Sequence, residues 1–329
     1  MRTRKLGNLT VSAIGMGCMG FSHGYGELPP REYAIAAMQK AYDAGCTFFD
    51  TAEGYGEGRN EEILGEAVRS FRKDVVIATK FHFRGDAPVG DAAIEASMRA
   101  HLTASMKRLG MDYVDLYYLH RVNRAVPVEA VAQVMGKLIR EGQIGGWGMS
   151  QVGVDTLAKA HAVTPVSAVQ NLYNMLERDC EKEVFPFCLK HNVGVVPFSP
   201  VASGFLSGKV NAQTDFSHWD DVRKFVPQLS KENIDQNQPV IDLLQVYAVE
   251  KKATNAQIAM AWMLHKYPNV VPIPGSKNQE RILENLGAAD IVLTDAEFAR
   301  LQAALDAIPV HGHRGQVEYD GQTMKDWNR

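Results

Sequence analysis

The chain has 329 residues, 46% of them hydrophobic and 22% charged, and carries a formal net charge of −3. This is the composition of an ordinary globular protein with a sizeable core, and it gives no general attraction to nucleic acid or to an anionic membrane surface. No apolar stretch reaches the ~20 residues that span a bilayer, and the four cysteines have no CxxC spacing, so we expect a soluble, cytoplasmic protein.

Eight short runs have the composition of β-strands. Most of them are almost continuously apolar rather than alternating, which is typical of parallel strands covered on both faces. In chain order they span residues 11–18, 46–51, 75–81, 113–120, 144–150, 166–173, 193–200 and 269–275.

Segments of helical period lie between these runs. Asp91 is expected to cap a helix that Gly110 ends, and Pro127 to open the next helix, which Gly142 ends. The spacing of a capping box occurs twice further on, at Thr254–Gln257 and Thr294–Glu297. Eight strands alternating with helices predict an α/β fold, a single-domain (β/α)8 TIM barrel over residues 1–329. A doubly wound open sheet stays possible, because strand counts from one sequence are uncertain by one or two.

Four polar side chains lie at or just after consecutive strand ends. Asp50 ends the second run, Lys80 the third and His120 the fourth, and Tyr55 follows the second run in a turn flanked by glycines. Each has an ordinary structural interpretation of its own: a turn cap, a snorkelling lysine, a core histidine and an exposed turn aromatic. In a barrel, however, the carboxyl ends of neighbouring strands meet on one face. We therefore expect these four side chains to converge.

Their chemistry suits proton transfer to a carbonyl oxygen. An unpaired ammonium beside a barrel core is costly, and Asp50 is the expected partner of Lys80. The charged amine would lower the pKa of Tyr55 below its ordinary value of about 10. His120, as a neutral imidazole, would orient a carbonyl towards Tyr55. The combination predicts hydride reduction of an aldehyde or ketone, with the hydride supplied by a cofactor.

The segments FFDTAEGYG followed by NEEILGEAV, VVIATK and VDLYYLH resemble the aldo-keto reductase superfamily. The resemblance runs over nearly the whole chain, including KLGNLTVSAIGMGCMGFS, GWGMS and PIPGSKNQERILENLGA. It implies a (β/α)8 barrel that reduces a small-molecule carbonyl substrate with NADPH, forming NADP+. The first of these phrases and PFSPVASGFLSGK are most similar to the bacterial, plant and fungal branches near perakine, pyridoxal and aryl-alcohol reductases. The catalytic tetrad that the resemblance implies is Asp50, Tyr55, Lys80 and His120.

The run GMGCMG, residues 15–20, fits the dinucleotide fingerprint GxGxxG but lacks the helix that must follow it at once. Pro29 and Pro30 place the next helix near Arg31 instead. We therefore reject a Rossmann domain. The resemblance implies that this stretch lines the mouth of the cofactor and substrate site.

A phosphate site is predicted after the eighth run. Basic residues at a helix start oppose the helix dipole unless an anion lies among them, and here Lys277 and Arg281 could surround a phosphate monoester together with Ser276. The resemblance implies the adenosine 2′-phosphate site of NADPH, with adenine nearby. The residues that it implies at this end are Gly275, Ser276, Lys277, Arg281, Glu284 and Asn285.

The nicotinamide end is also given by the resemblance. Ser150 and Gln170 match the residues that hold the carboxamide, and Phe198, with Ser199 beside it, stands where many members have a stacking tyrosine. Gln151 departs from the asparagine that many members have after the serine.

Residues 211–238, after the seventh run, form the longest stretch without clear periodicity. We interpret them as a lid loop that becomes ordered over a bound dinucleotide. The C-terminal segment contains His311 and His313, but no carboxylate or cysteine cluster accompanies them, so we predict no metal site. Trp327 is expected near the substrate pocket.

Two other functional classes stay open. A barrel of the aldolase type could use Lys80 as a Schiff-base nucleophile, and a reductase-like barrel can serve as a cofactor-binding regulatory subunit. The physiological substrate and the oligomeric state are unknown from the sequence.

Overall fold

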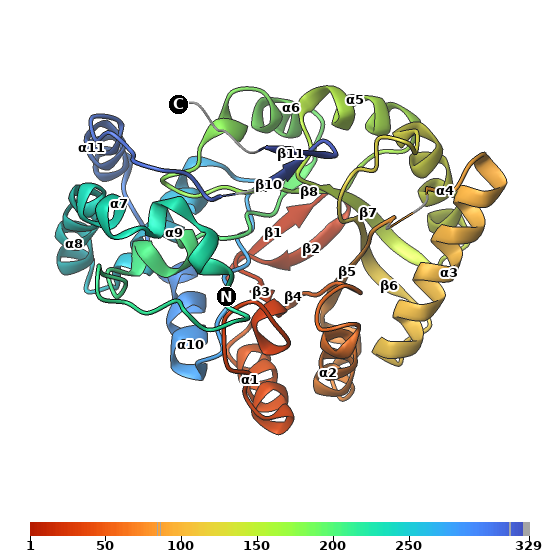
Figure 1. Ribbon diagram of the computed structural model, residues 1–329, viewed down its shortest axis with the longest axis horizontal. Helices are drawn as coiled ribbons and strands as arrows, with labels where there is room; N and C mark the ends of the chain where they lie inside the picture. The colour runs from red at the N-terminus through yellow and green to blue at the C-terminus, as the bar shows by residue number, and fades with distance from the viewer. Residues whose placement is uncertain (84, 86, 316, 325–329) are drawn as a thin grey trace.

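The computed structural model describes residues 1–83, 85, 87–315 and 317–324. Its central element is one sheet of parallel strands in which each strand pairs with the next along the chain (Figure 1). The strands of this sheet are β3 (Met16–Gly17), β4 (Phe48–Asp50), β5 (Val76–Phe81), β6 (Val114–Leu119), β7 (Ile144–Ser150), β8 (Ala168–Gln170) and β9 (Gly194–Val195).

The segment 269–275 closes the ring between β9 and β3. It is extended, and isolated parallel bridges join Val270 to Val195 and Gly275 to Gly17. The predicted eighth strand is therefore in place but is not a regular strand, because Pro272 and Pro274 have no N–H to donate to a ladder. The sheet is a closed (β/α)8 barrel, as predicted, and not an open doubly wound sheet.

Helices surround the barrel on its outside (Figure 1). None of the helices in the described part of the chain is long and apolar enough to cross a membrane. The α-helices are α1 (Arg31–Asp43), α2 (Arg59–Val68), α3 (Asp91–Leu109), α4 (Val128–Arg140), α5 (Val154–Val163), α6 (Val184–Lys190), α7 (Lys231–Gln236), α8 (Gln238–Lys251), α9 (Asn255–Lys266), α10 (Gln279–Gly287) and α11 (Asp295–Asp306).

Most of the helix signals in the sequence are confirmed. α9 and α11 both begin with complete capping boxes, and α1 begins at Arg31. Gly110 takes the left-handed conformation that ends α3. The cap of α3 was predicted one residue too late, since Gly90 holds the cap position and Asp91 is already helical. Pro127 likewise precedes α4 and is not its first residue.

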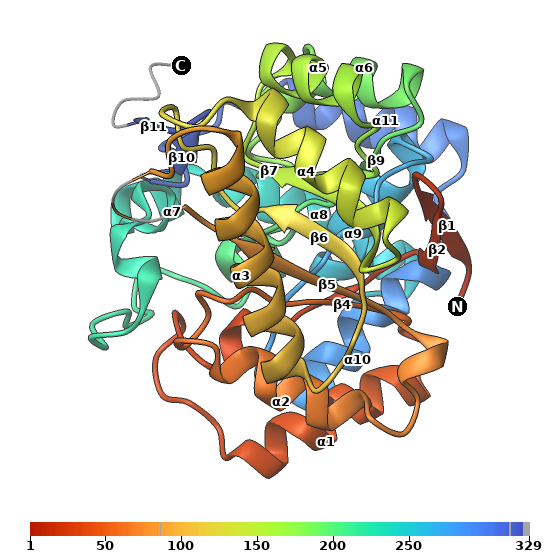
Figure 2. The ribbon, with the colours of Figure 1, turned by 90° about the vertical axis from the view of Figure 1, so that its right-hand side faces the viewer.

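The predicted first strand, 11–18, is wrong as a single element. Its beginning belongs to a hairpin of β1 (Thr3–Leu6) and β2 (Leu9–Ser12), and only β3 joins the barrel. Leu6 and Val11 of the hairpin are buried in the same apolar cluster as the side chains inside the barrel. Figure 2 shows this hairpin at one end of the barrel and the hairpin β10 (Val317–Tyr319)–β11 (Gln322–Met324) at the other. The N-terminal end of the barrel is therefore plugged, and the carboxyl ends of the strands face the other way.

Alternation along the strands decides which polar groups enter the barrel. The cluster inside the barrel contains an apolar residue from each of four strands: Phe48, Ala78, Tyr118 and Ala168. Successive side chains point to opposite faces, so the residue two positions later also faces inward. Those residues are Asp50, Lys80, His120 and Gln170. The period of the strand thus brings four polar side chains to the open end of an otherwise apolar interior.

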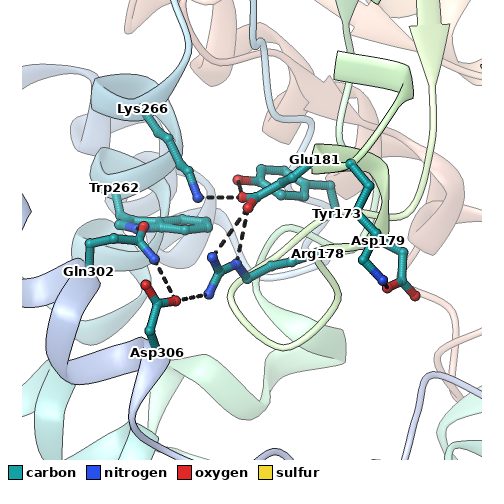
Figure 3. Close-up of polar contacts among 9 residues, drawn as sticks. Tyr173, Arg178, Asp179, Glu181, Trp262, Lys266, Gln302 and Asp306 are labelled. Carbon is teal, nitrogen blue, oxygen red and sulfur yellow. Dashed lines mark hydrogen bonds and ion pairs between the residues drawn. The ribbon is translucent and has the colours of Figure 1, made fainter. Parts of the chain in front are cut away.

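On the outside, one carboxylate links the loop after β8 to two helices (Figure 3). Glu181 accepts hydrogen bonds from Tyr173 (2.5 Å) and Lys266 of α9 (2.6 Å) through Oε1, and from Arg178 through Oε2. Arg178 also donates to Asp306 of α11, at 2.5 Å. A carboxylate shared by two cations and a phenol, all partly buried, contributes more than an exposed ion pair does.

We expect Glu181→Ala to destabilise the protein by about 1.5–3 kcal/mol, because it leaves two partly buried cations without their shared acceptor. Urea unfolding at neutral pH measures this loss. Glu183→Ala is the matched control, since Glu183 is exposed and its side chain makes no cap hydrogen bond to α6. Equal stability of the two variants would contradict the role given to Glu181.

Candidate active site

A cavity of about 1250 Å³ opens at the carboxyl ends of the strands. Asp50, Tyr55 and His120 line it, as predicted for residues at strand ends. Lys80 lies immediately behind them, with no exposed surface. The four side chains proposed from the sequence are therefore brought together.

The ammonium of Lys80 is fully engaged. It donates to Asp50 Oδ1 at 2.5 Å, to the carbonyl oxygen of Thr51 at 2.6 Å and to the hydroxyl of Tyr55 at 3.3 Å. The second oxygen of Asp50 accepts a hydrogen bond from Gln170 Nε2 at 2.8 Å. A buried ion pair needs such additional hydrogen bonds to offset the loss of water around both charges.

Electrostatics keep the ammonium of Lys80 charged. Burial alone lowers the pKa of Lys80, but Asp50 and Tyr55 outweigh it and the pKa is raised above 10.5. Burial raises the pKa of Asp50, against the opposing effects of Lys80 and of the hydrogen bond from Gln170. Lys80 therefore remains an ammonium at neutral pH.

The pKa of the Tyr55 hydroxyl differs from the prediction. Burial is the largest influence and raises its pKa above the ordinary 10, while Lys80 lowers the pKa and Asp50 raises it. The prediction of a pKa below 10 is therefore wrong for the net effect, although the ammonium acts in the expected direction. Because the net shift is upward, Tyr55 stays protonated through the neutral range and is able to donate a proton.

Two imidazoles flank the phenol. The ring of His120 lies edge-on to Tyr55 with centroids 5.7 Å apart, and the ring of His23 lies on another side at 5.3 Å. His120 is held at its backbone by a hydrogen bond to the carbonyl of Phe81. Burial lowers the pKa of His23, so its imidazole is neutral at neutral pH. An imidazole next to a phenol can hydrogen-bond an oxygen placed beside it.

The loop that carries Tyr55 is anchored by one buried amide. Asn60, at the start of α2, accepts from Thr51 Oγ1 at 2.6 Å and donates to the carbonyl of Cys18 and to Ser22 Oγ, both at 2.9 Å. These contacts join the loop after β4 to the loop after β3. They explain why a buried polar residue begins the run NEEILGEAV.

The proposed nicotinamide residues lie beside the tetrad. Ser150 and Gln170 pair across β7 and β8 at the strand ends, and both line the cavity with Phe198 and Ser199. Gln151, the departure from the family pattern, points elsewhere: its side chain accepts a hydrogen bond from the backbone of Leu172.

The proposed adenosine residues lie at the other end of the same cavity. All six of them line it, and the side chain of Arg281 is exposed at the start of α10. Lys277 is tied to the opposite loop, since its ammonium donates to the carbonyls of Tyr25 and Glu27. Glu284 forms an ion pair of 3.7 Å with Lys209.

The segment after β9 crosses the cavity mouth. Asp220 accepts a hydrogen bond from the backbone of Gly24 at 2.8 Å, and Val222 donates to the carbonyl of the same residue at 3.0 Å. The second half of the predicted loop 211–238 is wrong as a structureless stretch, because it forms α7, whose cap is Ser230. A serine three residues before Asn233 was the available signal, and it was missed.

Sequence reasoning also missed several residues that line the cavity. Arg121 directly follows His120, so the rule that located His120 should have included it. Arg223 and Arg314 come from loops whose folding no periodicity predicts. Of the C-terminal histidines, His313 lines the cavity, whereas Trp327 lies outside the described residues.

The fold and the site together define a barrel enzyme whose reactive groups gather at the strand ends. Comparison with known proteins gives its class, because residues 13–306 match the model of the Aldo/keto reductase family. The chain belongs to this family, as the resemblance implied.

Individual relatives agree with this assignment. The chain is 36% identical to a probable aldo-keto reductase 1 of Glycine max over 96% of its own length and 91% of that protein's. It is similar to an aldo-keto reductase of Klebsiella pneumoniae solved in complex with NADPH, with 27% identity, a TM-score of 0.74 and coverage of 96% and 100% of the two chains. It is also similar to the glycerol dehydrogenase of Gluconobacter oxydans, with 25% identity, a TM-score of 0.82 and coverage of 93% and 95%.

Proposed function

We propose that the protein reduces an aldehyde or ketone to an alcohol with NADPH, using Tyr55 as the proton donor. The observation that carries this proposal is the contact of the Tyr55 hydroxyl, which lines the large cavity, with the buried, charged Lys80 behind it. A protonated phenol next to a fixed cation can give its proton to an oxygen that gains negative charge, and the cation then stabilises the phenolate.

Each neighbour of Tyr55 has a definable part. Asp50 holds Lys80 in place and keeps it charged, while Gln170 fixes the second carboxylate oxygen. His120 is placed to hydrogen-bond the carbonyl oxygen and to orient it towards Tyr55. NADPH, when bound, supplies the hydride.

The cavity fits a dinucleotide phosphate in size and in charge. Its volume of about 1250 Å³ exceeds the ~300–1,000 Å³ of ordinary small-ligand sites. Among the described residues that line it, six are lysine or arginine and only Asp50 and Glu284 are acidic, and both acids are paired.

Ser150, Gln170 and Phe198 would hold the nicotinamide, and Ser276, Lys277 and Arg281 the adenosine phosphate. The complex of the Klebsiella pneumoniae reductase with NADPH supports the same choice of cofactor.

The geometry disfavours Lys80 as a Schiff-base nucleophile. Its ammonium donates three hydrogen bonds, its pKa is raised by Asp50 and Tyr55 against burial, and it has no surface in the cavity. A nucleophilic lysine needs the opposite, a neutral and accessible amine. The same contacts support a role of Tyr55 in turnover, which a purely regulatory subunit would not require.

We expect Tyr55→Phe to lower kcat for aldehyde reduction by roughly 10²–10⁴-fold, the usual worth of a general acid, while the variant still binds NADPH. In the wild type, the rate should fall only as the pH rises through the raised pKa of Tyr55, above 10, because the acid must be protonated to react. Following NADPH absorbance across pH, with NADPH binding measured by fluorescence, checks both points. Reductase activity retained in Tyr55→Phe would refute the role of the phenol.

Arg281→Ala should raise the KM for NADPH about tenfold or more and change the KM for NADH little, because only NADPH carries the 2′-phosphate that the guanidinium would bind. Steady-state kinetics with both cofactors measures the difference. Arg300→Ala, which removes an exposed arginine from α11, is the matched control. An equal effect of Arg281→Ala on both cofactors would reject the phosphate assignment.

We further propose that the segment 211–221 is a lid that binding of NADPH stabilises. Its contacts with Gly24 span the cavity mouth, and Arg223 next to it lines the cavity. Saturating NADPH should therefore slow protease cleavage between residues 211 and 221. Residues 87–90, which include the exposed Val89, lie outside the cavity lining and should be cut at the same rate in both states. Equal cleavage of the lid with and without NADPH counts against the proposal.

A further inference from the structure

Arg121 is a cation at the reactive end of the cavity that the proposed reduction does not use. It follows β6 directly and lines the cavity together with Tyr55 and His120. Its Nη1 donates to the carbonyl oxygen of His120 at 2.5 Å and to Ser150 Oγ at 2.9 Å. One corner of the guanidinium is thus fixed against the two strand ends that carry the proposed oxygen-binding and nicotinamide-binding groups.

The other edge of the guanidinium is free. Among the described residues, neither Nε nor Nη2 of Arg121 has a hydrogen-bond partner, and neither nitrogen is sealed away from solvent. These two nitrogens form the planar fork that binds both oxygens of a carboxylate at once. Because Nη1 anchors the group, the fork is held in the cavity without further loss of side-chain freedom.

The charge of Arg121 is not neutralised by the protein. None of the carboxylates in the described part of the chain forms an ion pair with it, and Glu318 of β10 and Tyr55 act on it only through longer-range electrostatics. The two acids that line the cavity are occupied by Lys80 and Lys209. A cation surrounded by protein and lacking a counter-ion favours an anionic ligand beside it.

We infer that Arg121 binds a carboxylate of the substrate, so that the substrate class is carbonyl acids: aldehydes or ketones that carry a carboxylate. This inference rests on the proposed function, since the same molecule must present its carbonyl oxygen to Tyr55 and His120. Binding the distant carboxylate in a fixed fork would also orient the carbonyl, which contributes to the rate as well as to affinity.

Matched pairs of substrates test this inference. Glyoxylate and 4-carboxybenzaldehyde are each compared with their methyl esters, which keep the carbonyl and remove the charge. In the wild type, kcat/KM should be higher for each acid than for its ester. In Arg121→Met, which keeps the length of the side chain, the acid-to-ester ratio should fall about tenfold or more, as expected for a lost charge-assisted fork. Arg121→Lys should fall between the two, because it keeps the charge without the fork.

The ratio separates recognition from a merely structural role. If Arg121 served only to position Ser150, its loss would reduce acid and ester turnover equally and the ratio would not move. Arg124→Met is the control for loss of a nearby positive charge, since Arg124 is exposed, donates to the carbonyl of Asp320 and does not line the cavity. An unchanged ratio in Arg121→Met, or the same fall in Arg124→Met, overturns the inference.

Binding of benzoate distinguishes failure of this inference from failure of the proposed function. Benzoate has the carboxylate but no carbonyl to reduce, and calorimetry measures its affinity without turnover. Its dissociation constant should rise about tenfold in Arg121→Met and remain unchanged in Arg124→Met. If no aldehyde is reduced but benzoate binding still depends on Arg121, the reductase proposal fails and the carboxylate site stands. If aldehydes are reduced but benzoate binds both variants equally, the carboxylate site fails alone.

Discussion

The ion pair between Lys80 and Asp50 is the constraint on which the site depends. An ammonium with no exposed surface, at the end of a strand whose other inward side chains are apolar, is tolerated only with a carboxylate and further acceptors around it. Those acceptors are the backbone of Thr51 and the hydroxyl of Tyr55, so satisfying the charge also fixes the phenol. The hydrogen bonds that stabilise the buried charge are therefore the same ones that fix the proposed proton donor.

This ion pair lies at the deep, buried end of the cavity, and the residues that line the cavity become more exposed towards its other end. The tetrad lies at the deep end, with Gln170 and Ser150 on adjacent strands, and the exposed arginine of α10 lies at the other. Short-range hydrogen bonds set the geometry of the deep end, whereas the outer end depends on loops that meet across the mouth, as Lys277 and the loop of Tyr25 do. The deep end suits chemistry that needs fixed atoms, and the outer end suits recognition of a large charged ligand.

Much of this arrangement is predictable from the sequence, for physical reasons. Apolar strands with a polar residue at or near the end, such as β4 with Asp50 and β5 with Lys80, predict both the barrel and the position of its candidate active site. The apolar pattern of 269–275 predicts a regular strand, but the structure has an irregular extended segment there. The prolines remove individual hydrogen-bond donors without changing the apolar pattern, so the pattern does not reveal the difference. The direction of the pKa shift of Tyr55 was also not predictable, because it depends on how deeply the whole fold buries the hydroxyl. Arg121 lies beyond the end of β6, where the strand pattern no longer predicts the direction of a side chain.

The closure of the barrel has a consequence for the proposed cofactor site. Between β9 and β3 the wall is the segment 269–275, which contains two prolines and is joined to its neighbours by five backbone hydrogen bonds, with bridges at Val270 and Gly275. Because Pro272 and Pro274 have no N–H, the bonds on the β3 side all run from Gly15 and Gly17 to carbonyls of the segment, and this side holds fewer bonds than a full ladder would. The same segment continues into α10, so the side of the barrel wall with the fewest hydrogen-bond donors is the one that leads to the proposed cofactor site.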